Sequence, residues 1–144
     1  MAVKVTVYAD ATHDKLEWFT KEVQEEAQNL ALKKAALVVE REAKKQLTKN
    51  GRHPRGTATP SMPGSPPSII TGSLRASVKT FPVTRPSGFD SYQIMIGPTM
   101  VYARVQELGG GNNLPPRPYM APAIEQTRDT VREVYIATIK GYIN

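Results

Sequence analysis

The longest regular pattern in the sequence is a helical one, which extends from Asp14 to about Thr48. This stretch contains no glycine or proline and is rich in alanine, leucine, glutamate, lysine and glutamine, which favour helices. Its apolar side chains recur three and four residues apart, at Leu16, Phe19, Val23, Ala27, Leu30, Leu32, Ala36, Val39, Ala43 and Leu47. The pattern predicts a single helix of about 35 residues, about 50 Å long.

The apolar stripe of this predicted helix drifts around the helix axis partway along. Two interpretations of the drift remain open. In the first, one end of the helix extends beyond the domain's own core and contacts a neighbouring subunit. In the second, a kink near Asn29 folds both halves of the helix onto one core.

Alternating apolar and polar residues predict three short strands. Valine alternates with polar residues in segment 2–8, as in a strand with one buried face. Segments 78–83 and 91–97 are predicted to form two antiparallel strands, the second with Tyr92, Ile94 and Ile96 on one face. Residues 84–89 between them include proline, serine and glycine, which are typical of a hairpin connection.

Two short helices are predicted in the second half of the chain. Thr71 is placed to cap a helical turn that ends at Ser77. Segment 101–108 carries apolar residues at i, i+4 and i+7, so Val101, Val105 and Leu108 are predicted to face inward. Gly109 is predicted to close this helix in the left-handed conformation.

The last element is predicted to be a helix from about Pro122 to Lys140. Proline is favoured in the first turn of a helix, because the N–H group that it lacks would have no partner there. One face of this helix is predicted to be buried, with Ile124, Thr127, Val131, Val134, Tyr135 and Thr138.

Residues 49–70, called the Pro-rich segment below, have neither a helical nor a strand pattern. The segment contains five prolines and three glycines but few apolar side chains. A stretch of this kind inside a compact domain is commonly either functional or disordered until a partner binds. We expect an extended arm within a single domain, residues 1–144, because too little chain precedes it to form a second domain.

The net charge of +6 is concentrated in one third of the chain. Between Ala43 and Phe89 there is no acid, but there are eight basic residues: Lys44, Lys45, Lys49, Arg52, Arg55, Arg75, Lys79 and Arg85. This distribution predicts a negatively charged partner, either nucleic acid or an acidic protein surface. A basic surface that is simply solvated is the alternative.

The residues needed for catalysis or metal binding do not form a recognisable pattern. The chain has no cysteine and only two histidines, His13 and His53, which are too few for a zinc site. No nucleophile with a neighbouring base stands out, and the glycines at 109–111 lack the lysine and hydroxyl residue of a nucleotide-binding loop. The sequence therefore predicts a protein that is not an enzyme and that needs no cofactor or metal.

Membrane association is also not expected. No apolar run approaches the roughly 18 residues that a membrane helix requires, and the first residues lack the apolar block of a secretion signal. We expect a soluble protein that is made in a cytoplasm.

Two short segments about thirty residues apart carry a recognisable combination of residues. The first, which follows a proline-containing stretch, has Thr71, Gly72, Leu74, Arg75 and Ser77. The second has Tyr102, Ala103, Glu107, Gly109, Pro118, Tyr119, Pro122 and Ala123. In this order and with the flanking helices, the chain between about 66 and 123 resembles the small neck proteins of long-tailed bacteriophages. These are tail-completion or head-tail joining proteins.

The resemblance implies an α+β fold, in which a small antiparallel sheet packs against a long N-terminal helix and a C-terminal helix. It also implies a structural virion protein that forms a hexameric or dodecameric ring in the phage neck. The ring would join the head, at its portal or connector, to the tail tube, or would complete the tail. The expected partners are copies of the same chain, portal, adaptor or stopper proteins, and the tail tube or tail terminator. The protein would be in the host cytoplasm during assembly and then in the virion.

We expect particular residues to lie at the interfaces of such a ring. Arg52 and Arg55 of the Pro-rich segment are expected to dock against an acidic partner, while Glu107, Arg117 and Tyr119 help to form the seam between subunits. The other interface residues that the motifs imply are Thr71, Gly72, Leu74, Arg75, Tyr102, Gly109 and Pro118.

Two other classes of function remain as alternatives. The first is a basic nucleic-acid-binding protein without enzymatic activity, although a neck ring could also contact the genomic DNA in its channel non-specifically. The second is a small phage enzyme such as a nuclease.

Overall fold

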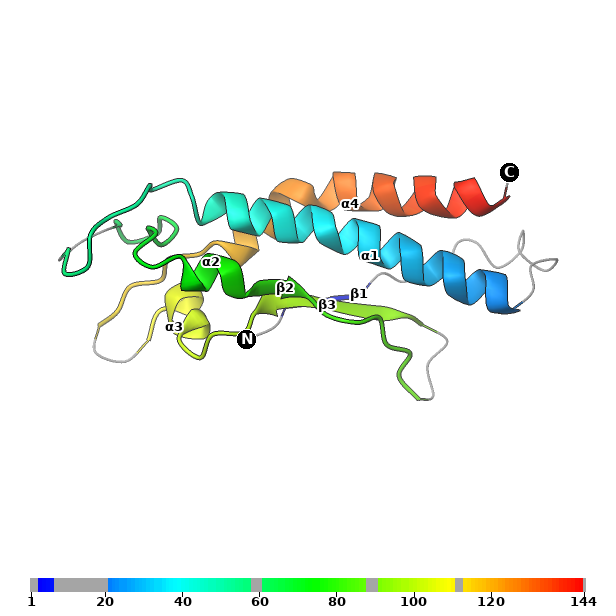
Figure 1. Cartoon of the computed structure of the whole chain (residues 1–144), viewed down its shortest axis with the longest axis horizontal. Coiled ribbons are helices and arrows are strands. Elements are labelled where there is room, and N and C mark those ends of the chain that lie inside the picture. Colours follow the sequence, from blue (N-terminus) through cyan, green and yellow to red (C-terminus); the bar gives the residue numbers. More distant parts are fainter. Residues whose placement is uncertain (1–2, 7–20, 58–60, 88–90, 111–112, 144) are drawn as a thin grey trace.

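Two long helices and a small antiparallel sheet form the fold, so the predicted combination of helices and sheet is confirmed (Figure 1). The computed structural model describes residues 3–6, 21–57, 61–87, 91–110 and 113–143. Along the chain the elements are β1 (Val3–Thr6), α1 (Lys21–Gln46), α2 (Ser73–Ser77), β2 (Val78–Thr80), β3 (Gln93–Pro98), α3 (Ala103–Leu108) and α4 (Met120–Ile143). The predicted beginning of the first helix, at Asp14, lies outside the described residues.

Helix α1 lies between α4 on one side and the sheet on the other (Figure 1). Its buried residues are mostly small, which lets the neighbouring layers approach closely. They are Ala27, Ala31, Leu32, Ala35, Ala36, Val39, Ala43 and Gln46, and Leu47 directly after the helix is buried as well. A helix that packs against two layers needs a wide, drifting apolar stripe, and α1 continues through Asn29 as one uninterrupted helix. The drift in the described part is therefore explained by burial within the chain.

Strand β3 is the centre of the sheet and pairs antiparallel with β1 on one edge and β2 on the other. Ile94 and Ile96 of β3 are buried in the core shared with α1, while Met95 between them is exposed. Burying such an isoleucine contributes about 1.5–3 kcal/mol to folding. β2 is shorter than the predicted strand 78–83, but Thr84 still pairs with Gln93. The predicted hairpin is thus confirmed.

Helix α4 begins two residues before Pro122 and ends at Ile143. Its buried residues are Met120, Ala123, Thr127, Tyr135 and Ile139. Ile124 and Val131 of the predicted face are partly buried against the core. The predicted helix is confirmed, and its buried face is centred close to where the apolar spacing placed it.

The predicted orientation of α3 is wrong. Val101, Val105 and Leu108 are all exposed, Val101 to 96%. The buried positions of α3 are instead Ala103 and Glu107, which are four residues apart on the opposite side. A helix of six residues buries only one or two side chains, and the hydrogen bonds that the Glu107 carboxylate accepts select which face is buried.

The described parts of the Pro-rich segment form a loop whose two ends bond to each other. The N–H group of His53 donates to the carbonyl of Ile69 at 2.9 Å, and that of Ile69 donates to the carbonyl of Gly51 at 2.9 Å. The Asn50 amide also donates to Ser65 Oγ at 3.0 Å. Since both ends of the segment bond to each other, the loop is anchored next to the end of α1.

Candidate functional site

The two motif segments meet at the end of the molecule that lies opposite the C-terminus, where α2 and α3 are found (Figure 1). They form the walls of a pocket of about 320 Å³, which we call the motif pocket. Six residues that the sequence assigned to a partner interface line this pocket: Thr71, Gly72, Leu74, Arg75, Tyr102 and Arg117. The Pro-rich segment supplies further walls with Ser61 and residues 67–70. Residues more than forty positions apart in the sequence are therefore brought into one site.

Local geometry at the start of α2 explains two of the motif residues. Gly72 occupies the N-cap position with φ of 84°, a left-handed conformation that glycine adopts without strain. The predicted cap, Thr71, lies one residue earlier, and its Oγ1 accepts a hydrogen bond from the N–H group of Ser73 at 3.3 Å. This turn directs the chain from the Pro-rich segment into α2.

Glu107 holds α3 against the start of α4. One carboxylate oxygen accepts hydrogen bonds from the N–H groups of Tyr119 at 2.8 Å and Met120 at 3.0 Å, and the other accepts from Ala121 at 2.9 Å. The first N–H groups of a helix have no partner within the helix. A negative charge near them is also stabilising, because the N-terminal end of the helix dipole is positive. Glu107 therefore caps α4 through N–H groups that lie twelve to fourteen positions later in the sequence.

The expectation that Glu107 and Tyr119 form a seam between subunits needs correction. The Glu107 side chain is only 5% exposed and Tyr119 is fully buried. Both residues are committed to contacts inside the chain. Pro118, between the loop and α4, is partly buried.

Tyr119 lies in the core with its hydroxyl group buried, and no hydrogen-bond partner for it is found among the described residues. Burial raises the pKa of Tyr119 well above its ordinary value, and the negative charge of Glu107 raises it further. Tyr119 therefore stays protonated at any physiological pH and acts as a core side chain.

Replacing Tyr119 by phenylalanine removes an unpaired polar group from the core. The free energy of unfolding is therefore expected to fall by no more than about 0.5 kcal/mol from the wild-type value and to rise by up to about 1 kcal/mol. The matched control is Tyr135→Phe, since the Tyr135 hydroxyl donates to Gln28 Oε1. That control is expected to cost about 1 kcal/mol. Urea unfolding measures both, and an equal loss in the two variants would show that the Tyr119 hydroxyl has a partner.

Gly109 has φ of 76° and ends α3, as predicted, although its extended ψ of 175° differs from the left-handed helical conformation. A Cβ atom at this position would lie 2.8 Å from the carbonyl oxygen of Leu114. The N–H group of Gly110 donates to that same oxygen at 3.1 Å. The loop after α3 therefore passes so close to itself that only glycine fits.

Arg117 connects the second motif to the Pro-rich segment. Its backbone N–H group donates to the carbonyl of Gln106 at 2.7 Å, and its guanidinium group donates to the carbonyl of Ser61 at 3.3 Å. The N–H group of Gly64 donates to the carbonyl of Pro116 at 2.9 Å. These bonds explain why the Pro-rich segment lies beside the motif pocket.

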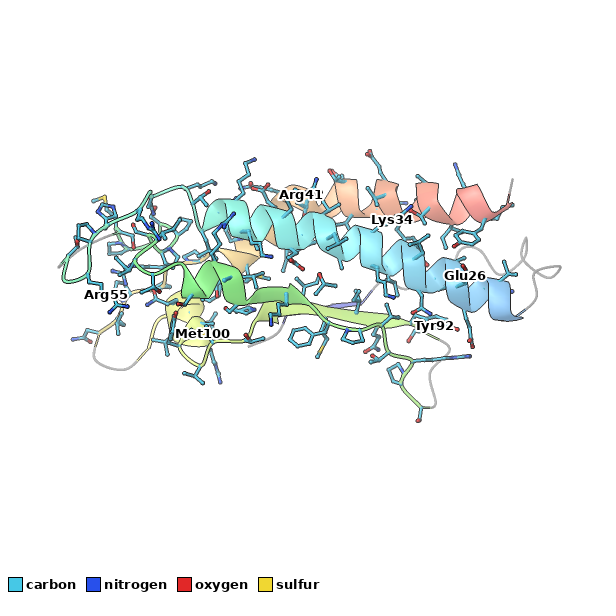
Figure 2. All side chains as sticks on the ribbon, viewed as in Figure 1. Glu26, Lys34, Arg41, Arg55, Tyr92 and Met100 are labelled. Atoms are coloured by element: carbon cyan, nitrogen blue, oxygen red, sulfur yellow. The ribbon has the colours of Figure 1, made fainter. Side chains whose placement is uncertain are left out.

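Arg52 and Arg55 are both exposed and do not line the motif pocket. Figure 2 shows Arg55 on the Pro-rich segment, at the same end of the molecule as α3. Their position leaves them accessible to a partner at this end.

Sequence reasoning missed an exposed apolar surface beside the motif pocket. We call Val101, in the turn before α3, together with Val105 and Leu108 of α3 the α3 ridge; they are 96%, 37% and 56% exposed. Tyr102 and Leu114 at the pocket edge are also exposed. The second motif segment indicates this surface, because Ala103 and Glu107, four residues apart, share one face of a helix. The ridge residues then fall on the opposite face.

A second groove, of about 460 Å³, lies along α1 and reaches Arg75 of α2. Its charged residues are Arg41, Lys44, Lys45, Arg75 and Glu40. Burial alone would raise the pKa of Glu40, but hydrogen bonds from Lys44 at 2.6 Å and Thr80 at 2.7 Å outweigh it and lower that pKa. The groove therefore carries a net positive charge.

Within the described residues, no three histidine, cysteine or acidic side chains are arranged to hold a metal ion. In that same part of the chain, none of the helices combines the length and the apolar character needed to cross a membrane.

The chain was compared with known protein families, curated proteins and solved structures. No protein-family model matches the chain, and no curated protein or solved structure was found to match it.

Proposed function

We propose that this chain is a structural protein of a bacteriophage neck, whose copies form a hexameric or dodecameric ring between the head and the tail. The proposal starts from the two motif segments and their order in the sequence. It is supported by their arrangement, because residues of both segments line one pocket at one end of the molecule. In this ring the chain contacts copies of itself, the portal or connector side of the neck, and the tail.

The exposure of the α3 ridge is the main structural support for the proposed ring. Apolar side chains that gather on an exposed surface mark a site of protein contact, and Val101, Val105 and Leu108 are all exposed. A ring subunit needs such a surface, because each copy must cover part of its neighbour. The seam therefore involves Val101, Val105 and Leu108 in place of the buried Glu107 and Tyr119.

The Pro-rich segment is the proposed contact with a neighbouring ring. Its ends are held against the body, while Arg52 and Arg55 remain exposed. An anchored basic loop loses less conformational freedom on binding than a free arm does. We assign these arginines to an acidic surface of an adjoining neck or tail protein.

Arg52→Glu combined with Arg55→Glu is expected to reduce tail attachment at least about tenfold, because it places like charges against the acidic partner. The variant is supplied to a phage that lacks its own copy, and infectious particles and tailless heads are counted. Arg128→Glu combined with Lys140→Glu, on the exposed side of α4, is the matched charge control. Wild-type yield from the Arg52 and Arg55 variant would reject this contact.

The basic groove along α1 favours a second candidate function, the binding of nucleic acid without sequence specificity. Arg41, Lys44, Lys45 and Arg75 could neutralise phosphates there. Such binding would weaken steeply as salt concentration rises, because counterions are released from the nucleic acid. A gel shift over a salt series tests it, and retained binding after Arg41→Gln with Lys45→Gln would argue against the groove.

A further inference from the structure

The motif pocket has walls of two kinds. Arg75 and Arg117 give it positive charge, and no acidic side chain is among the described residues that line it. Its other walls include the apolar side chains of Leu47, Ile69, Ile70, Leu74 and Leu114. A ligand that fills such a pocket must present a negative group and apolar surface close together.

The two arginines have unused hydrogen-bonding capacity. The Nε atom of Arg117 is buried and lacks a hydrogen-bond partner, although its guanidinium group is held in place by the Ser61 carbonyl. No ion pair in the described part of the chain involves Arg75 or Arg117. Because both guanidinium groups line the pocket and neither has an acidic partner there, an anionic group that enters the pocket can pair with them.

We propose that the motif pocket binds an extended polypeptide segment of a partner protein, with one acidic side chain placed between Arg75 and Arg117. Arginine pairs with carboxylate through two parallel hydrogen bonds, which fixes the orientation of the bound segment. The apolar residues that flank the acid contact Ile70, Leu74 and Leu114. The ligand is thus an acidic-apolar peptide.

The apolar walls favour a peptide over a nucleic-acid backbone. A duplex is too wide for a pocket of about 320 Å³, and a phosphodiester chain has no apolar side chains with which to cover the leucines and isoleucines. A polypeptide can place acidic and apolar side chains within a few ångströms of each other. Binding of such a peptide therefore buries apolar surface and at the same time pairs its acidic side chain with the arginines of the pocket.

This inference rests on the proposed function only for the source of the segment, which would be an adjoining neck or tail subunit. The pocket itself can be tested on the isolated protein, whether or not it forms rings. Rings without peptide binding would overturn the inference alone, whereas peptide binding without rings would overturn the ring and leave the pocket assignment in place.

The test is a methyl NMR titration of protein labelled at leucine and isoleucine. The probe is the peptide acetyl-Ala-Leu-Glu-Leu-Ala-amide, and the comparison ligands replace its glutamate by glutamine or phosphoserine, with a ten-nucleotide single-stranded DNA as a further ligand. We expect the glutamate peptide to shift the methyl signals of Ile69, Ile70, Leu74 and Leu114. The glutamine peptide should bind at least about fivefold more weakly, since the charge-assisted bonds are lost.

Arg75→Gln is expected to weaken the glutamate peptide about five- to tenfold. Arg75 is exposed, so the variant should fold normally, and Lys79→Gln, an exposed residue outside the pocket, is the matched control with unchanged affinity. The proposal is overturned if those methyl signals do not move, if glutamine binds as well as glutamate, or if Arg75→Gln has no effect. Tighter binding of the phosphoserine peptide or the DNA would overturn the assignment to a carboxylate.

Discussion

Glu107→Gln is expected to lower the free energy of unfolding by about 3 kcal/mol, a large effect for a substitution that preserves size. The glutamate carboxylate accepts three N–H groups at the start of α4. Glutamine has one acceptor oxygen, and its amide would point N–H groups at a backbone N–H group. One or more buried donors are then left without a partner, and the charge that opposes the helix dipole is also lost.

Urea unfolding of purified protein measures this effect, with Glu125→Gln as the control. Glu125 is exposed on α4, close to the same helix end, so its substitution should change stability by less than about 0.5 kcal/mol. Equal stability of the Glu107 variant and the wild type would show that the carboxylate does not cap α4.

Val101→Asp combined with Leu108→Asp is expected to abolish ring assembly while leaving the fold intact. Both side chains are exposed in the single chain, so the free energy of unfolding should change by less than about 0.5 kcal/mol. At a subunit contact each apolar side chain contributes about 1.5–3 kcal/mol. Losing both should weaken each contact by at least about 3 kcal/mol, or more than a hundredfold.

The control for the α3 ridge is Leu37→Asp combined with Ile136→Asp, which changes two exposed apolar residues on α1 and α4. Size-exclusion chromatography with light scattering compares the two double variants. Assembly that is lost in the control but kept in the ridge variant would place the subunit contact on the long helices, and α3 would then be free surface.

Long-range periodicity made the framework of this fold predictable. In α1 and α4 many apolar residues share one side, so an error at any single position hardly changes the expected buried face. The alternation around Ile94 and Ile96 likewise identified the inner face of β3. The expected extent of the first helix, which included residues 14–20, lies partly outside the described residues.

The candidate site was predicted less well, because it depends on single hydrogen bonds. A glutamate in a short helix is normally solvated, so nothing in the spacing of apolar residues indicates that Glu107 is buried and that Val101 is exposed. The N–H groups that it binds belong to a helix that begins more than ten residues later. Six of the motif residues line one pocket, but the contacts that each of them makes could not be predicted from the sequence.

The most direct test of ring assembly is electron microscopy of the purified protein, combined with a measurement of particle mass. We predict closed rings with a mass six or twelve times the 15.9 kDa of the chain. We also predict that the protein is present in mature virions, at the junction between head and tail. A protein that stays at 15.9 kDa at all concentrations tested, and that is absent from mature particles, would contradict the proposed neck function.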